Sequence, residues 1–129
     1  MFRFNKILLT SLCLVIIVFC LIGIEKVYAK QKPIVIVAVG DIACDPTSKH
    51  FNNGHGENGL CQMEDTAKIT SEVAQLRAVL PLGDNQYEKA TLEDFQASYD
   101  SSWGRFNKIA YPVAGNHEYL TKNAQGYYQ

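Results

Sequence analysis

The chain has 129 residues, of which 47% are hydrophobic and 19% charged, and its formal net charge is −1. This length allows about one domain, and the composition is that of a globular protein rather than a disordered one. Because the charges nearly balance and no basic cluster stands out, the sequence gives no nucleic-acid-binding patch.

Residues 1–29 have the pattern of an export signal. Arg3 and Lys6 give a positive start, an apolar run follows over 7–24, and Val27 with Ala29 suits cleavage by signal peptidase. The run is longer than the roughly 7 to 15 apolar residues of most cleaved signals and reaches the roughly 17 to 25 that span a bilayer. A cleaved signal peptide and an uncleaved membrane anchor therefore both remain open. Either one predicts that residues 30–129 are exported, as a secreted or cell-surface protein, because a positive start stays inside.

Two cysteines downstream of this leader, Cys44 and Cys61, predict a disulfide in an oxidising compartment. The loop between them is rich in glycine and asparagine and has little to pack, so closing it would stabilise the fold by about 3 kcal/mol in the chain-entropy model. The alternative is a metal site that also uses His50 and His55, but the spacing matches no zinc pattern. We therefore expect both histidines to be solvated loop residues.

The rest of the chain alternates between strand and helix patterns. The β-branched run at 33–40 predicts a strand that is buried on both faces. A helical period over 62–77 predicts a helix that buries Met63, Ala67, Thr70 or Ile69, Val73 and Ala74 on one side. A second strand follows at 78–83, where Pro81 indicates an edge position or a bend.

Two further elements complete the pattern. Thr91 with Asp94 three residues later predicts the start of a short helix that runs to about Tyr99. The third strand is expected at 109–115. Strand, helix, strand, helix, strand is typical of parallel βαβ units, so the fold class is α/β.

Each predicted strand ends in a glycine that is followed at once by a residue able to bind metal. The endings read "VGDIA" (39–43), "LGDNQY" (82–87) and "AGNHE" (114–118). Because the carboxyl ends of parallel strands meet at one edge of a sheet, we expect the three clusters to face one crevice. Glycine allows the sharp turn that exposes the next side chain.

A single Gly-Asp is usually only a turn, but three aligned endings favour a site. Asp41 and Asp84 in one crevice would repel each other unless cations lay between them. Oxygen ligands from Asp, Asn and Tyr suit iron, manganese, magnesium or zinc. The sequence therefore predicts a metal centre at this edge.

The three blocks, GD-x-A, GD-x-x-Y and GNHE, resemble the first three motif blocks of the calcineurin-like metallophosphoesterases. Ala43, at a position where most of that superfamily has a histidine, together with Tyr87 resembles the purple acid phosphatase branch. The flanks "VAVGDIACDP" and "TLEDFQASYDSSWGRF" look like those of exported bacterial phosphatase-like proteins. The resemblance runs from Ile34 to the end of the chain.

The resemblance implies a role for each residue of the blocks. Asp41 and Tyr87 would bind one metal, Asp84 would bridge two, and Asn116 would bind the second. The pair would be iron with zinc, manganese or magnesium. His117 would contact the phosphate of the ester substrate and help neutralise or protonate the leaving group, and Glu118 would support the ligands from behind. The metals would activate a water for in-line attack on phosphorus, so no protein nucleophile is needed.

The resemblance also implies an αββα sandwich, of which this chain would supply the N-terminal βαβαβ portion. Only eleven residues follow Glu118 and none is a histidine, whereas the family has a further histidine and a Gly-His-x-His block. We therefore expect 30–129 to be an incomplete metallophosphoesterase domain. Two functions follow: a dinuclear-metal phosphoesterase that is only partly present, or a non-catalytic secreted or membrane-tethered fragment with at most weak metal binding. A nucleotide-binding domain ranks last, because no glycine-rich turn follows the first strand.

Overall fold

The computed structural model of the chain describes residues 14–17 and 32–129. Residues 14–17 form a helical turn, and the rest of the predicted leader, including most of the apolar run over 7–24, lies outside the described residues. No helix within the described part of the chain is both long and apolar enough to cross a membrane. Residues 34–129 form a separate structural unit, and the fold and the site belong to it.

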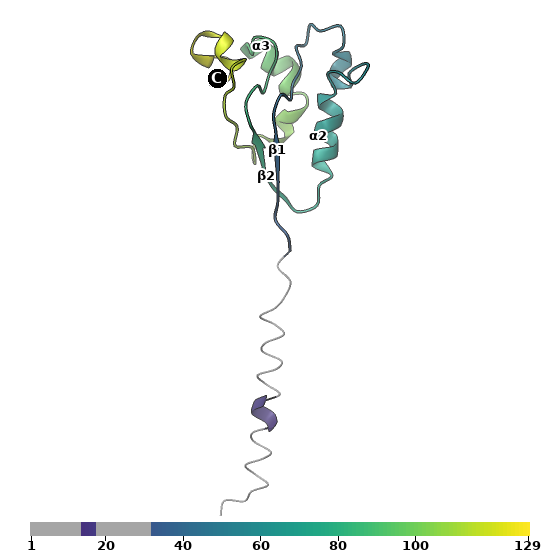
Figure 1. Cartoon of the computed structure of the whole chain (residues 1–129), viewed down its shortest axis with the longest axis vertical. Helices are drawn as coiled ribbons and strands as arrows, with labels where there is room; N and C mark the ends of the chain where they lie inside the picture. Colours follow the sequence, from purple (N-terminus) through teal and green to yellow (C-terminus); the bar gives the residue numbers. More distant parts are fainter. Residues whose placement is uncertain (1–13, 18–31) are drawn as a thin grey trace, which may run out of the picture. The chain divides into compact units, whose positions relative to one another are not determined.

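This unit is a small mixed α/β domain around a two-stranded parallel sheet (Figure 1). Strand β1 (Val35–Val39) pairs with β2 (Leu76–Pro81), with Val37 opposite Val79 and Val39 opposite Pro81. Helix α2 (Met63–Ser71) lies between them in sequence. The predicted βαβ unit is therefore confirmed, and the carboxyl ends of both strands lie at the same edge of the sheet.

The predicted third strand, 109–115, runs beside β2 without becoming a regular strand. Val79 donates to the carbonyl of Ile109 at 3.0 Å, and Tyr111 donates back to the carbonyl of Val79 at 2.9 Å. One isolated parallel bridge, between Val79 and Ala110, joins this segment to β2. Val113 also donates to the carbonyl of Pro81 at 3.0 Å, but Pro81 has no N–H to donate to the carbonyl of Tyr111, so the ladder is incomplete. Because β2 thus has a neighbour on each side, Pro81 marks the end of an inner strand and not an edge strand.

Helix α2 is shorter than the 62–77 that its sequence period predicts. Its buried residues are Met63, Ala67 and Thr70, as predicted, whereas Ile69 is exposed. The prediction is wrong for Val73 and Ala74, which lie beyond the end of the helix, Val73 half-buried and Ala74 exposed. The helix ends at Ser71 because the chain must turn to reach β1: Gln75 adopts a φ of 63°, and its carbonyl accepts from Val35 at 3.1 Å. The pairing of the strands has overridden the local helical preference.

The second predicted helix begins as expected. Helix α3 (Leu92–Asp94) has the capping box of Thr91 and Asp94, and it continues as the π-helix η2 (Phe95–Tyr99). The remaining elements are 3₁₀ turns: η1 (Asn52–Gly54), η3 (Trp103–Phe106), η4 (Glu118–Leu120) and η5 (Lys122–Ala124).

The core lies on one face of the sheet. Val79 is fully buried there, with Met63 and Ala67 of α2 and with Trp103 and Phe106 of η3. The prediction that 33–40 is buried on both faces is wrong: exposure alternates along β1, and Ile36 is 56% exposed. The described helices cover only the Val79 face, which leaves Ile36 on the open face.

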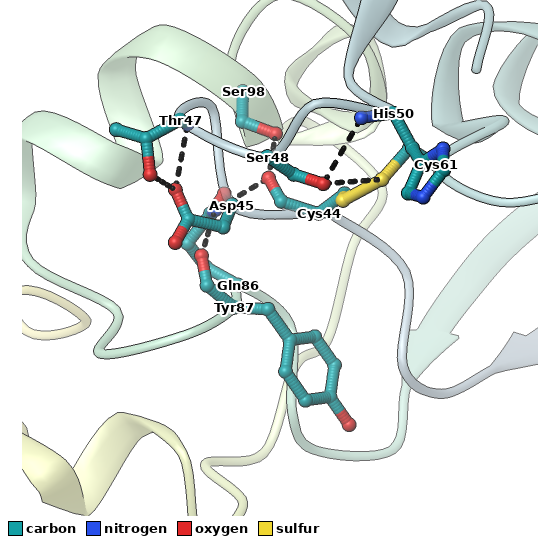
Figure 2. The surroundings of a disulfide bond; sticks show 9 residues. All are labelled: Cys44, Asp45, Thr47, Ser48, His50, Cys61, Gln86, Tyr87 and Ser98. Carbon is teal, nitrogen blue, oxygen red and sulfur yellow. Dashed lines mark hydrogen bonds between the residues drawn. A yellow bond between two sulfur atoms is a disulfide. The ribbon is translucent and has the colours of Figure 1, made fainter. Parts of the chain in front are cut away.

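A disulfide joins Cys44 to Cys61 and closes the loop between them (Figure 2). The carbonyl of Cys44 also accepts hydrogen bonds from Ser98 Oγ at 2.6 Å and from Gln86 Nε2 at 3.0 Å. Gln86 is fully buried, and its Oε1 accepts from the backbone N–H of Tyr99 at 3.1 Å. The start of the loop is therefore held to the segment just before α2 by the disulfide and to η2 by the Ser98 hydroxyl.

Removing this disulfide should lower the free energy of unfolding. We expect Cys61→Ser, in a chain whose leader cysteines are also serine, to lose about 3 kcal/mol, because the unfolded loop regains its freedom. Urea denaturation of oxidised and variant proteins measures the loss. Equal midpoints for the two would show that the loop is not held by this bond.

The buried Tyr99 should make the fold sensitive to alkaline pH. Burial, with smaller contributions from Asp100 and Tyr127, raises the pKa of Tyr99 from 10.0 to about 12. Because folding disfavours its phenolate, this contribution to stability is complete below pH 10 and is lost as pH rises towards about 12. Tyr99→Phe should therefore flatten the alkaline part of a curve of unfolding free energy against pH, whereas Tyr111→Phe, at an exposed site, should leave it unchanged.

Candidate metal centre

The turns that follow β1 and β2 run side by side beyond the sheet. Asp41 donates its backbone N–H to the carbonyl of Gly83 at 3.4 Å, and Ile42 donates to the carbonyl of Asp84 at 3.3 Å. Ala43 then donates to the carbonyl of Asn85 at 3.1 Å. This backbone pairing brings the first two predicted ligand blocks together at one edge of the sheet.

The third block joins them through a close backbone approach. The backbone N–H of His117 donates to Asp84 Oδ1 at 2.9 Å. A Cβ at Gly115 would lie 2.2 Å from the same Oδ1 and 2.3 Å from the backbone nitrogen of Asp84. Only glycine leaves room there, which gives this glycine a packing role as well as a turn role.

Both aspartates have a left-handed backbone conformation. The φ of Asp41 is 56° and that of Asp84 is 47°. Aspartate tolerates this region better than most residues, but it still costs on the order of 1 kcal/mol each, and such residues gather at functional sites. Each of these aspartates closely follows a strand of the parallel sheet. The left-handed conformation sets the direction of both carboxylates, although it raises the local backbone energy.

Three side-chain oxygens form a cluster at this edge. The hydroxyl of Tyr87 donates to Asp41 Oδ1 and lies 3.3 Å from Asp84 Oδ2. Burial, the hydrogen bond to Asp41 and the negative charge of Asp84 all raise the pKa of Tyr87 above its ordinary value of 10.0. The proton of Tyr87 thus holds together two carboxylates that would otherwise repel each other.

The side chain of Glu118 links the turns of the second and third blocks by hydrogen bonds. Its side chain is fully buried, and Oε1 accepts the backbone N–H groups of Asn85 at 2.8 Å and Gln86 at 3.2 Å. Oε2 accepts the backbone N–H of Gly115 at 2.6 Å. A buried carboxylate needs this number of donors to offset the loss of water. Glu118 therefore joins the turn of the second block to that of the third.

A hydrogen bond to the backbone fixes the orientation of the His117 ring and shows which of its nitrogens carries the proton. Its Nδ1 lies 2.6 Å from the backbone carbonyl of Glu88, and because a carbonyl only accepts, Nδ1 carries the proton. Its ring lies against that of Tyr87, with centroids 4.1 Å apart. Nε2 is then the nitrogen that remains to accept or donate a proton elsewhere.

The predicted ligand Asn116 does not join the cluster. It is exposed on the same turn as His117, and no contact of its amide with the cluster is found among the described residues.

One residue near the cluster, Glu88, was not predicted. Its carbonyl orients His117, and its carboxylate lies 3.7 Å from His117 Nδ1. No sequence signal marks it, since the orienting group belongs to the backbone.

The two loop histidines lie away from this cluster. His55 is exposed and pairs with Asp65 at 2.9 Å, in keeping with a solvated residue. The same prediction is wrong for His50, which is half-buried and has an enclosed Nδ1 without a hydrogen-bond partner.

Neither family models, nor curated proteins, nor solved structures gave a match to this chain. The case for a metal therefore depends on the donors themselves. The phenol of Tyr87 lies within hydrogen-bonding distance of both carboxylates, and the three groups form an oxygen-only donor set, which suits a hard cation. A bound cation would replace the Tyr87 proton between the carboxylates and reverse the direction of its pKa shift. Among the described residues, no group of three or more His, Cys, Asp and Glu side chains is placed to hold a metal ion, so the donor set reaches three residues only when Tyr87 is counted.

Proposed function

We propose that this chain carries the first part of a dinuclear-metal phosphoesterase centre, of the kind found in calcineurin-like metallophosphoesterases and closest to the purple acid phosphatase branch. The supporting observation is the placement of Tyr87 between the carboxylates of Asp41 and Asp84, directly after two parallel strands. The sheet with segment 109–113 would then be the N-terminal half of an αββα sandwich, exported by residues 1–29.

Each residue would have a separate role in this proposal. Asp41 and Tyr87 would hold one metal, Asp84 would lie between two, and Asn116 would reach the second. Iron with zinc, manganese or magnesium would activate a water and neutralise the phosphate of the ester. Asp84 Oδ1 is already fixed by the His117 N–H, which leaves Oδ2 to turn towards the cations.

His117 would act on the substrate and not on the metal. With Nδ1 donating to the Glu88 carbonyl, a protonated Nε2 could donate to a phosphate oxygen or to the leaving oxygen. The leaving group would thus depart as a neutral alcohol.

A second candidate is a non-catalytic exported fragment with at most weak metal binding. The supporting observation is that the sequence holds only three histidines, His50, His55 and His117, and that the first two are not in the cluster. The histidine ligands that the resemblance implies thus have no counterpart in this sequence.

Calorimetric titration with Mn²⁺ tests the proposal. We expect weak, saturable binding that falls at least about tenfold in Asp84→Asn, because this residue contacts both neighbouring blocks. Asp65→Asn, an equal change of charge on α2, should bind as the wild type does. Equal binding by Asp84→Asn, or none by the wild type, would contradict the proposal.

The rate of aryl phosphate hydrolysis by the same protein separates the two candidates. We expect a rate no faster than background for this sequence alone, since the histidine ligands that the resemblance implies have no counterpart in it. Robust manganese-dependent turnover would instead show that the groups present suffice for catalysis.

A further inference from the structure

A cavity of about 830 Å³ lies between the candidate metal centre and the disulfide loop. Asp41 and Tyr87 line it on the side of the centre, and Cys44 and Cys61 line it on the side of the loop. Its size is that of an ordinary small-molecule site. If a phosphate were held beside Asp41 and Tyr87, the organic part of the same ester could therefore occupy the rest of this cavity.

The lining has a marked electrostatic character. The acidic residues Asp45 and Glu88 line it in addition to Asp41, and none of the residues that line this cavity in the described part of the chain is lysine or arginine. The walls also include the aromatic residues Trp103 and Tyr87. Carboxylates together with aromatic faces favour an organic cation and disfavour an anion.

Unpaired polar atoms give an independent sign of an occupant. Three buried side-chain atoms of the described residues have no hydrogen-bond partner, and two of them, His50 Nδ1 and Trp103 Nε1, belong to residues that line this cavity. Trp103 is only 2% exposed. Buried polar groups are nearly always paired, and an indole N–H can only donate. The occupant should therefore also bring an oxygen that accepts, after a small adjustment of the wall.

We propose that this cavity binds a compact alkylammonium alcohol, as the organic part of a phosphate ester whose phosphate lies at Asp41 and Tyr87. The position of the phosphate rests on the proposed function, whereas the binding of the cation does not. In the ester the ammonium group would face Asp45 and Glu88, and the oxygen would lie towards the unpaired N–H.

Trp103 is the only tryptophan of the chain, so its fluorescence reports on this cavity directly. The full-length chain in mild detergent, with chelator present, is titrated with choline and with dimethylbutanol, its uncharged carbon isostere. We expect a saturable change with choline in the millimolar range, and binding of the isostere at least about 5-fold weaker because it lacks the charge. Equal responses to the two probes, or no response to choline, would overturn the proposal.

Substitution locates the cation. Asp45→Asn keeps the oxygen that accepts from Thr47 and removes only the charge, so it should weaken choline binding about 3- to 5-fold. Glu88→Gln should do the same, and Asp65→Asn, outside the cavity, should have no effect. Unchanged affinity in both cavity variants would overturn the proposal even if choline binds.

A third titration, with phosphocholine and manganese, tests the cation cavity and the proposed metal centre separately. With Mn²⁺ in place of chelator, phosphocholine should bind at least about tenfold more tightly than choline, since the phosphate then adds its own contacts. Choline binding without any gain from phosphate and manganese would support the cation cavity and count against the metal centre. Manganese-dependent binding of inorganic phosphate without any choline response would do the reverse.

Discussion

Gly115→Ala should destabilise the fold by more than about 3 kcal/mol and abolish metal binding with it. The new methyl group would lie 2.2 Å from Asp84 Oδ1 and 2.3 Å from the Asp84 backbone nitrogen, and the backbone nitrogen cannot move aside as a side chain could. The turns that carry Asp84 and His117 would have to separate. Urea denaturation gives the loss of stability, and Mn²⁺ titration of any folded protein gives the loss of binding.

Gly40, which directly precedes Asp41, provides the control substitution. A Cβ there would meet nothing closer than 3.8 Å. Gly40→Ala should therefore stay within about 1 kcal/mol of the wild type and keep its metal affinity. If the two alanine variants behaved alike, the close approach of the second and third blocks would not exist in solution.

Glu118→Gln should lower the free energy of unfolding by about 2 to 4 kcal/mol. Its carboxylate accepts three backbone N–H groups from two turns in a fully buried place, and an amide can accept at only one of the two positions. The other position would bring an NH₂ group against an N–H donor. Thermal or urea unfolding measures the effect.

Glu72→Gln is the control for that change, since Glu72 is an exposed residue at the end of α2. Its effect should stay within about 0.5 kcal/mol. A Glu118→Gln protein that is as stable as Glu72→Gln would show that the buried carboxylate does not join the two turns.

The sequence predicted which strand ends meet better than it predicted the packing around them. Gly-Asp pairs after apolar runs place Asp41 and Asp84 at one edge because strand direction alone decides which ends meet. The spacing of Thr91 and Asp94 likewise predicted a helix start, since a capping box is a local interaction.

What could not be predicted depends on contacts between distant segments. An all-apolar run such as that around Ile36 does not show which of its faces will be covered. The end of α2 is likewise not marked by any residue near Gln75. The helix ends because the chain must turn there so that Gln75 can pair with Val35. The orientation of His117 depends on a backbone carbonyl, which has no side-chain signature at all.

The central claim is that Tyr87 completes a metal centre with Asp41 and Asp84. Absorption spectroscopy tests it most directly, because a phenolate bound to ferric iron gives a visible charge-transfer band. At mildly acidic pH with excess ferric iron, we expect this band in the wild type and in Tyr111→Phe, and its loss in Tyr87→Phe. No band in the wild type, or an undiminished band in Tyr87→Phe, would contradict the account.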